Sequence, residues 1–302
     1  MVSTLSHVNF MPSENPIITI FMKTILVPTD FSATAKAAAL YAFNVAKQFQ
    51  ASKIVLYHAF QTPPVITEPS MPAVSYMDVD TLRHISETGM KHFKASLEAV
   101  CPSGIQIVEI VEFAVLSEEI DKVCERAGAE LIIMGITGTS KIEEVLIGST
   151  ALSVMKNTKV PMIIVPADNA NTAIKNVMMV TDLKNVVETT PTESIKKVLE
   201  ATNAQLHVVN IYEEDNDITG EKNYQQELLQ SLLQSFNPEF HFLYNHHFME
   251  GVNDFVKNNQ IDLIIAIPKK HGFFANFFKE GHTKKLAFHS HVPLMYVHNE
   301  EL

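Results

Sequence analysis

Short apolar runs alternate with amphipathic segments along most of the chain. In the first half, five mainly apolar runs have the length of buried parallel strands. They are residues 23–30, 54–60, 105–113, 131–135 and 160–165. Between them, apolar residues recur at helical spacing, which predicts helices over residues 35–49, 80–100 and 117–127 and after Thr150. Ser32 or Thr34 is the expected cap of the first helix, and Ser117 that of the third. This alternation predicts an α/β fold with a doubly wound parallel sheet.

The pattern restarts in the second half. KNVMMVTD at 175–182 follows KTILVPTD at 23–30 by 152 positions, and both segments end in Thr-Asp. VPLMYV at 292–297 follows VPMIIV at 160–165 by only 132 positions. The second copy therefore lacks about 20 residues, most simply the proline-rich loop between the second strand and second helix of the first copy.

The repeat predicts two domains, each with five parallel strands. The expected boundaries are residues 22–166 for the first domain and 174–302 for the second, joined by a polar linker at 167–173. Residues 1–21 are expected to form a flexible leader, and Met22 is an alternative start.

Composition narrows the function classes. A net charge of −11 argues against nucleic acid or an anionic membrane as the main partner. No apolar run approaches the roughly 20 residues of a membrane helix, and residues 1–21 contain no Lys or Arg, unlike a signal peptide. Two cysteines, Cys101 and Cys124, form no disulfide framework, so a cytoplasmic protein is expected.

The most informative stretch is residues 132–155, IIMGITGTSKIEEVLIGSTALSVM. An apolar run ends at Gly135, Gly138 lies in the following loop, and Gly148 precedes Ser149 and Thr150 at the start of a periodic segment. Glycines allow a ligand to approach the backbone closely, and the free amides of a helix's first turn accept anions. This pattern is typical of a phosphate-binding loop between a buried strand and a helix.

The spacing G-x2-G-x9-G-[ST] resembles the nucleotide loop of ATP-binding universal stress proteins. The resemblance spans roughly residues 22–298 and implies a tandem member with two Rossmann-like domains, similar to the adenine nucleotide alpha hydrolases. It implies the strand order 3-2-1-4-5 in each domain. It also implies antiparallel pairing of the last strands, 160–165 and 292–297, in an intramolecular pseudo-dimer. An apolar edge strand is a liability unless it is covered, which favours the same pairing.

The resemblance also implies a nucleotide site in the first domain. Asp30, in the segment PTDFS, ends the first strand at the edge where such sheets bind ligands. ATP is the expected cofactor, alone or with Mg²⁺. The expected nucleotide-binding residues are Pro28, Thr29, Asp30, Ala59, Met134, Gly135, Gly138, Gly148, Ser149 and Thr150. In the alternative interpretation, Asp30 only caps the following helix and the glycines only shape a tight loop.

The second domain keeps Asp182 but has Ile267 and Lys270 where the first two glycines of the loop align. No ATP site is expected there, and this half is expected to serve in pairing and regulation. The histidine pairs His246–His247 and His289–His291 have no accompanying metal-binding spacing, so no metal site is expected.

No nucleophile–base–acid order stands out, so no catalytic residue is assigned. The predicted function is that of an ATP-binding stress or signalling protein with at most a slow ATPase activity, working with a protein partner or as a homo-oligomer. The alternatives are a nucleotide-free interaction scaffold and a related α/β nucleotide hydrolase or transferase. The S-G-G-x-D-S, H-I-G-H and Walker motifs of those enzyme classes are absent from the sequence.

Overall fold

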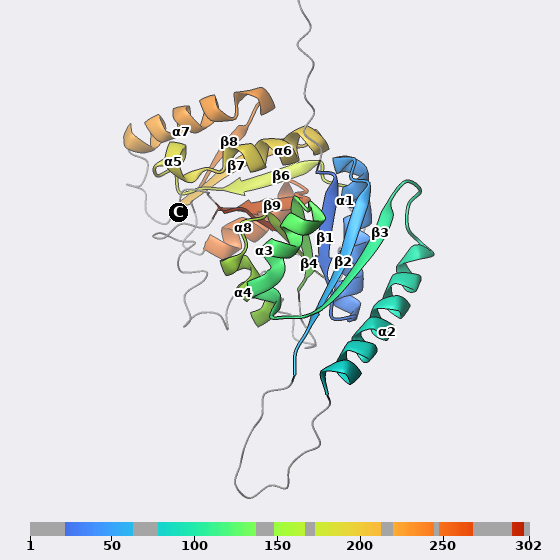
Figure 1. Cartoon of the computed structure of the whole chain (residues 1–302). Coiled ribbons are helices and arrows are strands. Elements are labelled where there is room, and N and C mark those ends of the chain that lie inside the picture. Colours follow the sequence, from blue (N-terminus) through green and yellow to red (C-terminus); the bar gives the residue numbers. More distant parts are fainter. Residues whose placement is uncertain are drawn as a thin grey trace, which may run out of the picture.

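All ten strands in the described part of the chain belong to one sheet (Figure 1). The computed structural model describes residues 22–62, 78–136, 148–166, 173–212, 220–244, 248–267 and 292–298. The strands are β1 (Thr24–Pro28), β2 (Lys53–Phe60), β3 (Gln106–Phe113), β4 (Leu131–Gly135), β5 (Met162–Val165), β6 (Asn176–Val180), β7 (Gln205–Tyr212), β8 (Glu239–Tyr244), β9 (Leu263–Ala266) and β10 (Leu294–Tyr296).

Within the described ranges, eight α-helices and one 3₁₀-helix lie between these strands. They are α1 (Ala33–Phe49), α2 (Val79–Glu98), α3 (Leu116–Ala127), α4 (Ser149–Asn157), α5 (Val186–Thr189), α6 (Thr192–Thr202), α7 (Gly220–Leu232), η2 (Gln234–Phe236) and α8 (Phe248–Asn258). None of the helices in the described ranges is both long and apolar enough to cross a membrane.

The strand order is β3-β2-β1-β4-β5-β10-β9-β6-β7-β8. Each half has the order 3-2-1-4-5 with parallel neighbours, and the halves join where β5 and β10 pair antiparallel. Leu294 lies opposite Ile164, and Tyr296 lies opposite Met162. The α/β fold class and the pairing of the last strands are therefore confirmed, whereas the domain boundaries stay a prediction.

The core lies on both faces of this sheet because side chains alternate along each strand. Ile25 and Val27 of β1 point to the face that α1, α2, α6 and α7 cover, and Leu26 points to the face that α3, α4 and α8 cover. Both apolar layers continue across the β5–β10 junction. The two halves therefore share one core.

The helix starts test the capping predictions. Ser32 is the N-cap of α1, and its hydroxyl accepts a 3.2 Å hydrogen bond from the N–H of Ala35, as predicted. The prediction for α3 was wrong: Val115 is its N-cap and Ser117 lies inside the first turn. The N–H of Ala114 still bonds to the carbonyl of Phe60 at the end of β2, so the chain leaves the sheet and enters the helix within two residues.

Several predicted features lie outside the described residues. They are the leader at 1–21, most of the proline-rich loop, nearly all of the linker, Gly138, Lys270 and the histidine pairs His246–His247 and His289–His291.

Candidate functional site

A cavity of about 620 Å³ opens at the carboxyl ends of β1, β2 and β4, where the starts of α3 and α4 also meet. Eight of the ten predicted nucleotide-binding residues line it: Pro28, Thr29, Asp30, Ala59, Met134, Gly135, Ser149 and Thr150. Gly148 is the N-cap of α4, directly before Ser149. Gly138 lies outside the described residues. The structure thus brings the predicted set together, and the role of each residue in binding stays a prediction.

The turn after β1 forms the floor of this cavity. The N–H of Ser32 donates to Oδ1 of Asp30 at 3.0 Å, and the N–H of Phe31 donates to the hydroxyl of Thr29 at 3.0 Å. Phe31 has φ 67°, a left-handed conformation that is unfavourable for an aromatic residue and is typical of functional turns. Since Ser32 caps α1, the alternative in which Asp30 is the helix cap does not apply.

His58 holds this turn from the neighbouring strand β2. Its Nδ1 lies 2.7 Å from the carbonyl oxygen of Thr29, and because a carbonyl only accepts, Nδ1 carries the proton. The ring of Phe31 stacks on His58 with the ring centroids 4.4 Å apart. On its other side Phe31 contacts α2 at Gly89, where an added Cβ would lie only 2.8 Å from the ring. Contacts from two elements therefore stabilise the left-handed residue.

Gly135 ends β4 at the wall of the cavity. A Cβ atom added at Gly135 would lie against the backbone carbonyl of Thr34, 2.7 Å from its carbon atom. The glycine is therefore required for the packing of β4 against the first turn of α1. This differs from the sequence-based reasoning, in which the glycine admits a ligand.

The first turn of α4 also lines the cavity. Gly148 has φ −65° and ψ 153°, an extended conformation that any residue adopts. Ser149 and Thr150 follow as exposed first-turn residues, with hydroxyls beside the free amides of the helix N-terminus. This turn can accept an anion.

Sequence reasoning missed part of the cavity lining. The additional residues are Thr34, Ala35, Tyr57, His58, Gln61, Ala114, Val115, Leu116, Ser117 and Ser153. Four of them, residues 114–117, belong to the connection after β3 and the first turn of α3. No Lys or Arg occurs among the described residues that line the cavity. Burial, with the carboxylate of Glu112 nearby, raises the pKa of Tyr57 above its ordinary range, so this phenol stays protonated.

The second half repeats the turn but not the glycine wall. Leu183 has φ 52°, its N–H donates to the hydroxyl of Thr181 at 3.1 Å, and Nδ2 of Asn210 donates to the carbonyl of Thr181 at 2.8 Å. At the position of Gly135 stands Ile267, which is buried in the core with Leu183. The helical segment after the turn that follows β6 is divided into α5 and α6, whereas the corresponding helix of the first half, α1, is continuous. In the second half, the branched side chain of Ile267 therefore occupies the position at which Gly135 of the first half allows α1 to lie close to β4.

Comparison with known proteins identifies the family. The family model described as "Universal stress protein family" matches residues 22–166. The universal stress protein MJ0531 of Methanocaldococcus jannaschii is 33% identical over 146 residues, which are 47% of this chain and 81% of the relative. The chain belongs to the universal stress protein family. The universal stress protein YxiE of Bacillus subtilis is 27% identical over 141 residues, 45% of this chain and 92% of the relative.

The whole universal stress protein chain also has a counterpart among solved structures. A universal stress protein from Archaeoglobus fulgidus superposes with a TM-score of 0.66 at 19% identity, covering 93% of this chain and 98% of that one. At this identity the likeness shows the fold alone. It extends the match in fold beyond the residues that the family model covers.

Proposed function

We propose that this universal stress protein binds one adenine nucleotide per chain, in the cavity of the first half. The cavity itself carries the proposal: its volume of about 620 Å³ lies within the usual range for small-ligand sites. It lies at the carboxyl edge of a doubly wound sheet, where such folds bind ligands. ATP, alone or with Mg²⁺, is the proposed ligand.

The two ends of the cavity suit different parts of a nucleotide. The first turn of α4, with Ser149 and Thr150, suits the phosphates because its free amides and positive dipole favour anions. Asp30 uses Oδ1 in its own turn, so its other oxygen suits a ribose hydroxyl. The backbone at Ala59, at the end of β2, suits the base.

The second half is not proposed to bind a nucleotide. Ile267 has a buried, branched side chain at the position where the first half has Gly135. This side chain fills the space in which the backbone of α1 lies close to Gly135 in the first half. Asp182 remains at the position of Asp30, with Oδ1 accepting from the N–H of Lys184 at 3.1 Å. The second half therefore serves as an internal control for the role of the carboxylate.

Bound nucleotide is proposed to act as a structural or signalling ligand, hydrolysed slowly or not at all. Rapid phosphoryl transfer needs positive charge and an oriented nucleophile at the transferring group. The described cavity lining offers hydroxyls and amides but neither Lys nor Arg. Binding of the phosphates without selective stabilisation of the transition state does not accelerate the reaction.

Calorimetry with ATP and Mg²⁺ tests the proposal. We expect a stoichiometry near one, with Asp30→Ala weakening binding by about tenfold or more through loss of a charged hydrogen-bond acceptor. Asp182→Ala removes the same turn carboxylate in the second half and should bind like the wild type. A stoichiometry near two, or equal losses in both variants, contradicts the proposed site. Turnover on the order of 1 s⁻¹ or faster contradicts the non-enzymatic role.

Mass spectrometry of small molecules released from the denatured, freshly purified protein addresses the ligand directly. An adenine nucleotide should be recovered. If none is recovered and ATP does not bind in calorimetry, the nucleotide-free interaction scaffold becomes the better interpretation.

A further inference from the structure

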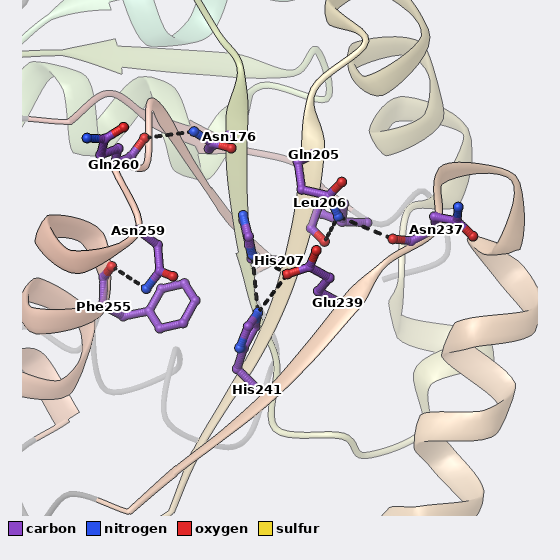
Figure 2. Close-up of polar contacts among 10 residues, drawn as sticks. All are labelled: Asn176, Gln205, Leu206, His207, Asn237, Glu239, His241, Phe255, Asn259 and Gln260. Atoms are coloured by element: carbon purple, nitrogen blue, oxygen red, sulfur yellow. Dashed lines mark hydrogen bonds and ion pairs between the residues drawn. The ribbon is translucent and has the colours of Figure 1, made fainter.

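Two histidines and a glutamate converge at the outer edge of the second half, far along the sheet from the cavity. His207 lies on β7, and Glu239 and His241 lie on the edge strand β8 (Figure 2). His207 is directly opposite Glu239 in the parallel register, and His241 is two residues further along the same strand. Since side chains alternate along a strand, all three point to one face of the sheet.

The ligand atoms of these side chains form a compact triangle. Nδ1 of His207 lies 3.1 Å from Nε2 of His241 and 3.5 Å from Oε2 of Glu239. The third side, from Nε2 of His241 to the same carboxylate oxygen, is 3.8 Å. Within the described residues this is a group of three potential metal ligands whose atoms all lie within 4.8 Å of one another.

The triangle matches the ligand spacing of a small divalent ion. Zinc binds histidine nitrogens at about 2.0–2.1 Å and carboxylate oxygens at similar lengths, usually in tetrahedral geometry, so two of its ligand atoms lie about 3.3 Å apart. The three observed separations bracket this value. A donor set of two imidazoles and one carboxylate also binds first-row transition metals in preference to Mg²⁺ or Ca²⁺.

The surroundings hold the triangle in place. The ring of Phe255 from α8 packs edge-on against His207 and His241, with centroid distances of 5.9 and 4.8 Å. Nε2 of Gln205 donates to the carbonyl of Asn237 at 3.3 Å, which ties the start of β7 to the turn before β8. His207 is 8% exposed, whereas the Glu239 side chain is 57% exposed. The ligands are therefore fixed on their inner side and open to solvent at the carboxylate.

We propose that His207, Glu239 and His241 bind one divalent cation of the zinc class. The ion would link β7 to the edge strand β8 and would keep one coordination position for water or an external ligand. This proposal is independent of the nucleotide site, because it uses other residues in the other half. The two rings share a hydrogen bond, and the Glu239 carboxylate lies 3.5 Å and 3.8 Å from their nearest nitrogens.

Titration of the metal-free full chain with Zn²⁺ alone tests this site. The protein is first stripped with a chelator, and binding is followed by calorimetry. We expect one equivalent to bind tightly, and His241→Gln and Glu239→Gln each to weaken that step by about 100-fold or more, since loss of even an outer-sphere partner costs 10–100-fold. A double variant, His84→Gln with His92→Gln on the exposed face of α2, is the matched control and should bind like the wild type.

Two further measurements separate binding from folding. His241 and Glu239 are more exposed than His207, so their variants should keep the wild-type circular dichroism spectrum and the same midpoint of urea unfolding without metal. Added Zn²⁺ should raise the Tm of the wild type and leave the Tm of His241→Gln unchanged. Absence of a tight equivalent in the wild type, or a tight equivalent that survives in both ligand variants, would overturn the proposal.

Discussion

The carbonyl oxygen of Thr29 accepts a 2.7 Å hydrogen bond from Nδ1 of His58, which joins the turn after β1 to the end of β2. In the second half, Asn210 donates in the same way to Thr181 at 2.8 Å. Nδ1 of histidine and Nδ2 of asparagine are the same number of bonds from the backbone. Each half therefore fixes its left-handed turn with a donor at the same position on its second strand.

This relationship makes His58→Ala and His58→Asn an informative pair. The alanine variant leaves the Thr29 carbonyl without its donor, and a lost hydrogen bond of this kind costs about 1 kcal/mol or more. We expect about five- to tenfold weaker ATP binding in calorimetry, because the turn that holds Asp30 is loosened. The asparagine variant should recover most of the affinity. Equal losses in both variants would point to a direct contact between the imidazole and the ligand.

Gly135→Ala should destabilise the first half. The new methyl group would lie against the Thr34 carbonyl at the start of α1, and overpacking of this kind costs about 1–3 kcal/mol. The measurement is the midpoint of urea unfolding. Gly220→Ala is the control, since an added Cβ there has no neighbour within 4 Å, and its midpoint should be unchanged. A wild-type midpoint for Gly135→Ala would show that the contact relaxes freely.

Ile164→Pro should destabilise both halves together. Ile164 lies opposite Leu294 of β10, and the N–H of the preceding residue, Ile163, points toward β4. Because successive N–H groups of a strand point to opposite sides, the N–H of Ile164 points toward β10. Proline removes that donor in the middle of the sheet, where proline is rarely tolerated. We expect lower stability in both halves at once, seen as faster hydrogen exchange in β1 and in β6. Loss of protection in β1 alone would contradict a shared core.

Alkaline pH should destabilise the folded protein. Burial, with Asp121 nearby, raises the pKa of Cys124 to about 12, and burial raises that of Tyr296 to about 12. Their ordinary values are 9.0 and 10.0, so above pH 9 the unfolded chain binds fewer protons than the folded one. These two groups should therefore leave the free energy of unfolding unchanged between about pH 7 and 9 and lower it between about pH 9 and 12.

The midpoint of urea unfolding, measured at several pH values, checks this decrease in the free energy of unfolding. Cys124→Ala removes the thiol contribution and should flatten the first part of the decline. A thiol reagent at pH 8 should modify Cys101, which is partly exposed, and reach the buried Cys124 only in denaturant. A wild-type midpoint that stays flat from pH 7 to alkaline pH would contradict the assignment.

Local patterns were sufficient to predict the strands of the first half, and the family resemblance indicated eight of the 18 residues that line the cavity. The apolar runs ending at Asp30 and Gly135 belong to adjacent strands, so their ends meet at one edge of the sheet. Periodicity does not show how the chain leaves a strand, so it predicts Ser117 as the cap, whereas the helix begins at Leu116.

The histidine–glutamate triangle could not be found from local patterns. His207 stands 32 positions before Glu239, and neither segment has a metal-binding spacing by itself. Only the register of β7 with β8 places them opposite one another. Gly135 is similar: the sequence shows a glycine, but only the packing of α1 against β4 shows the Thr34 carbonyl that requires it.

The antiparallel junction of β5 with β10 has the form of a dimer interface, yet both strands belong to one chain. In a symmetric homodimer every substitution appears on both sides of the twofold axis. Here each half can change alone, while covalent linkage keeps the partner strand at a fixed local concentration even in dilute solution. The second half can therefore have Ile267 at the position equivalent to Gly135 and Asn210 at the position equivalent to His58. It can also have a His–Glu–His triangle of its own. Having both strands in one chain thus permits the halves to differ without weakening their association.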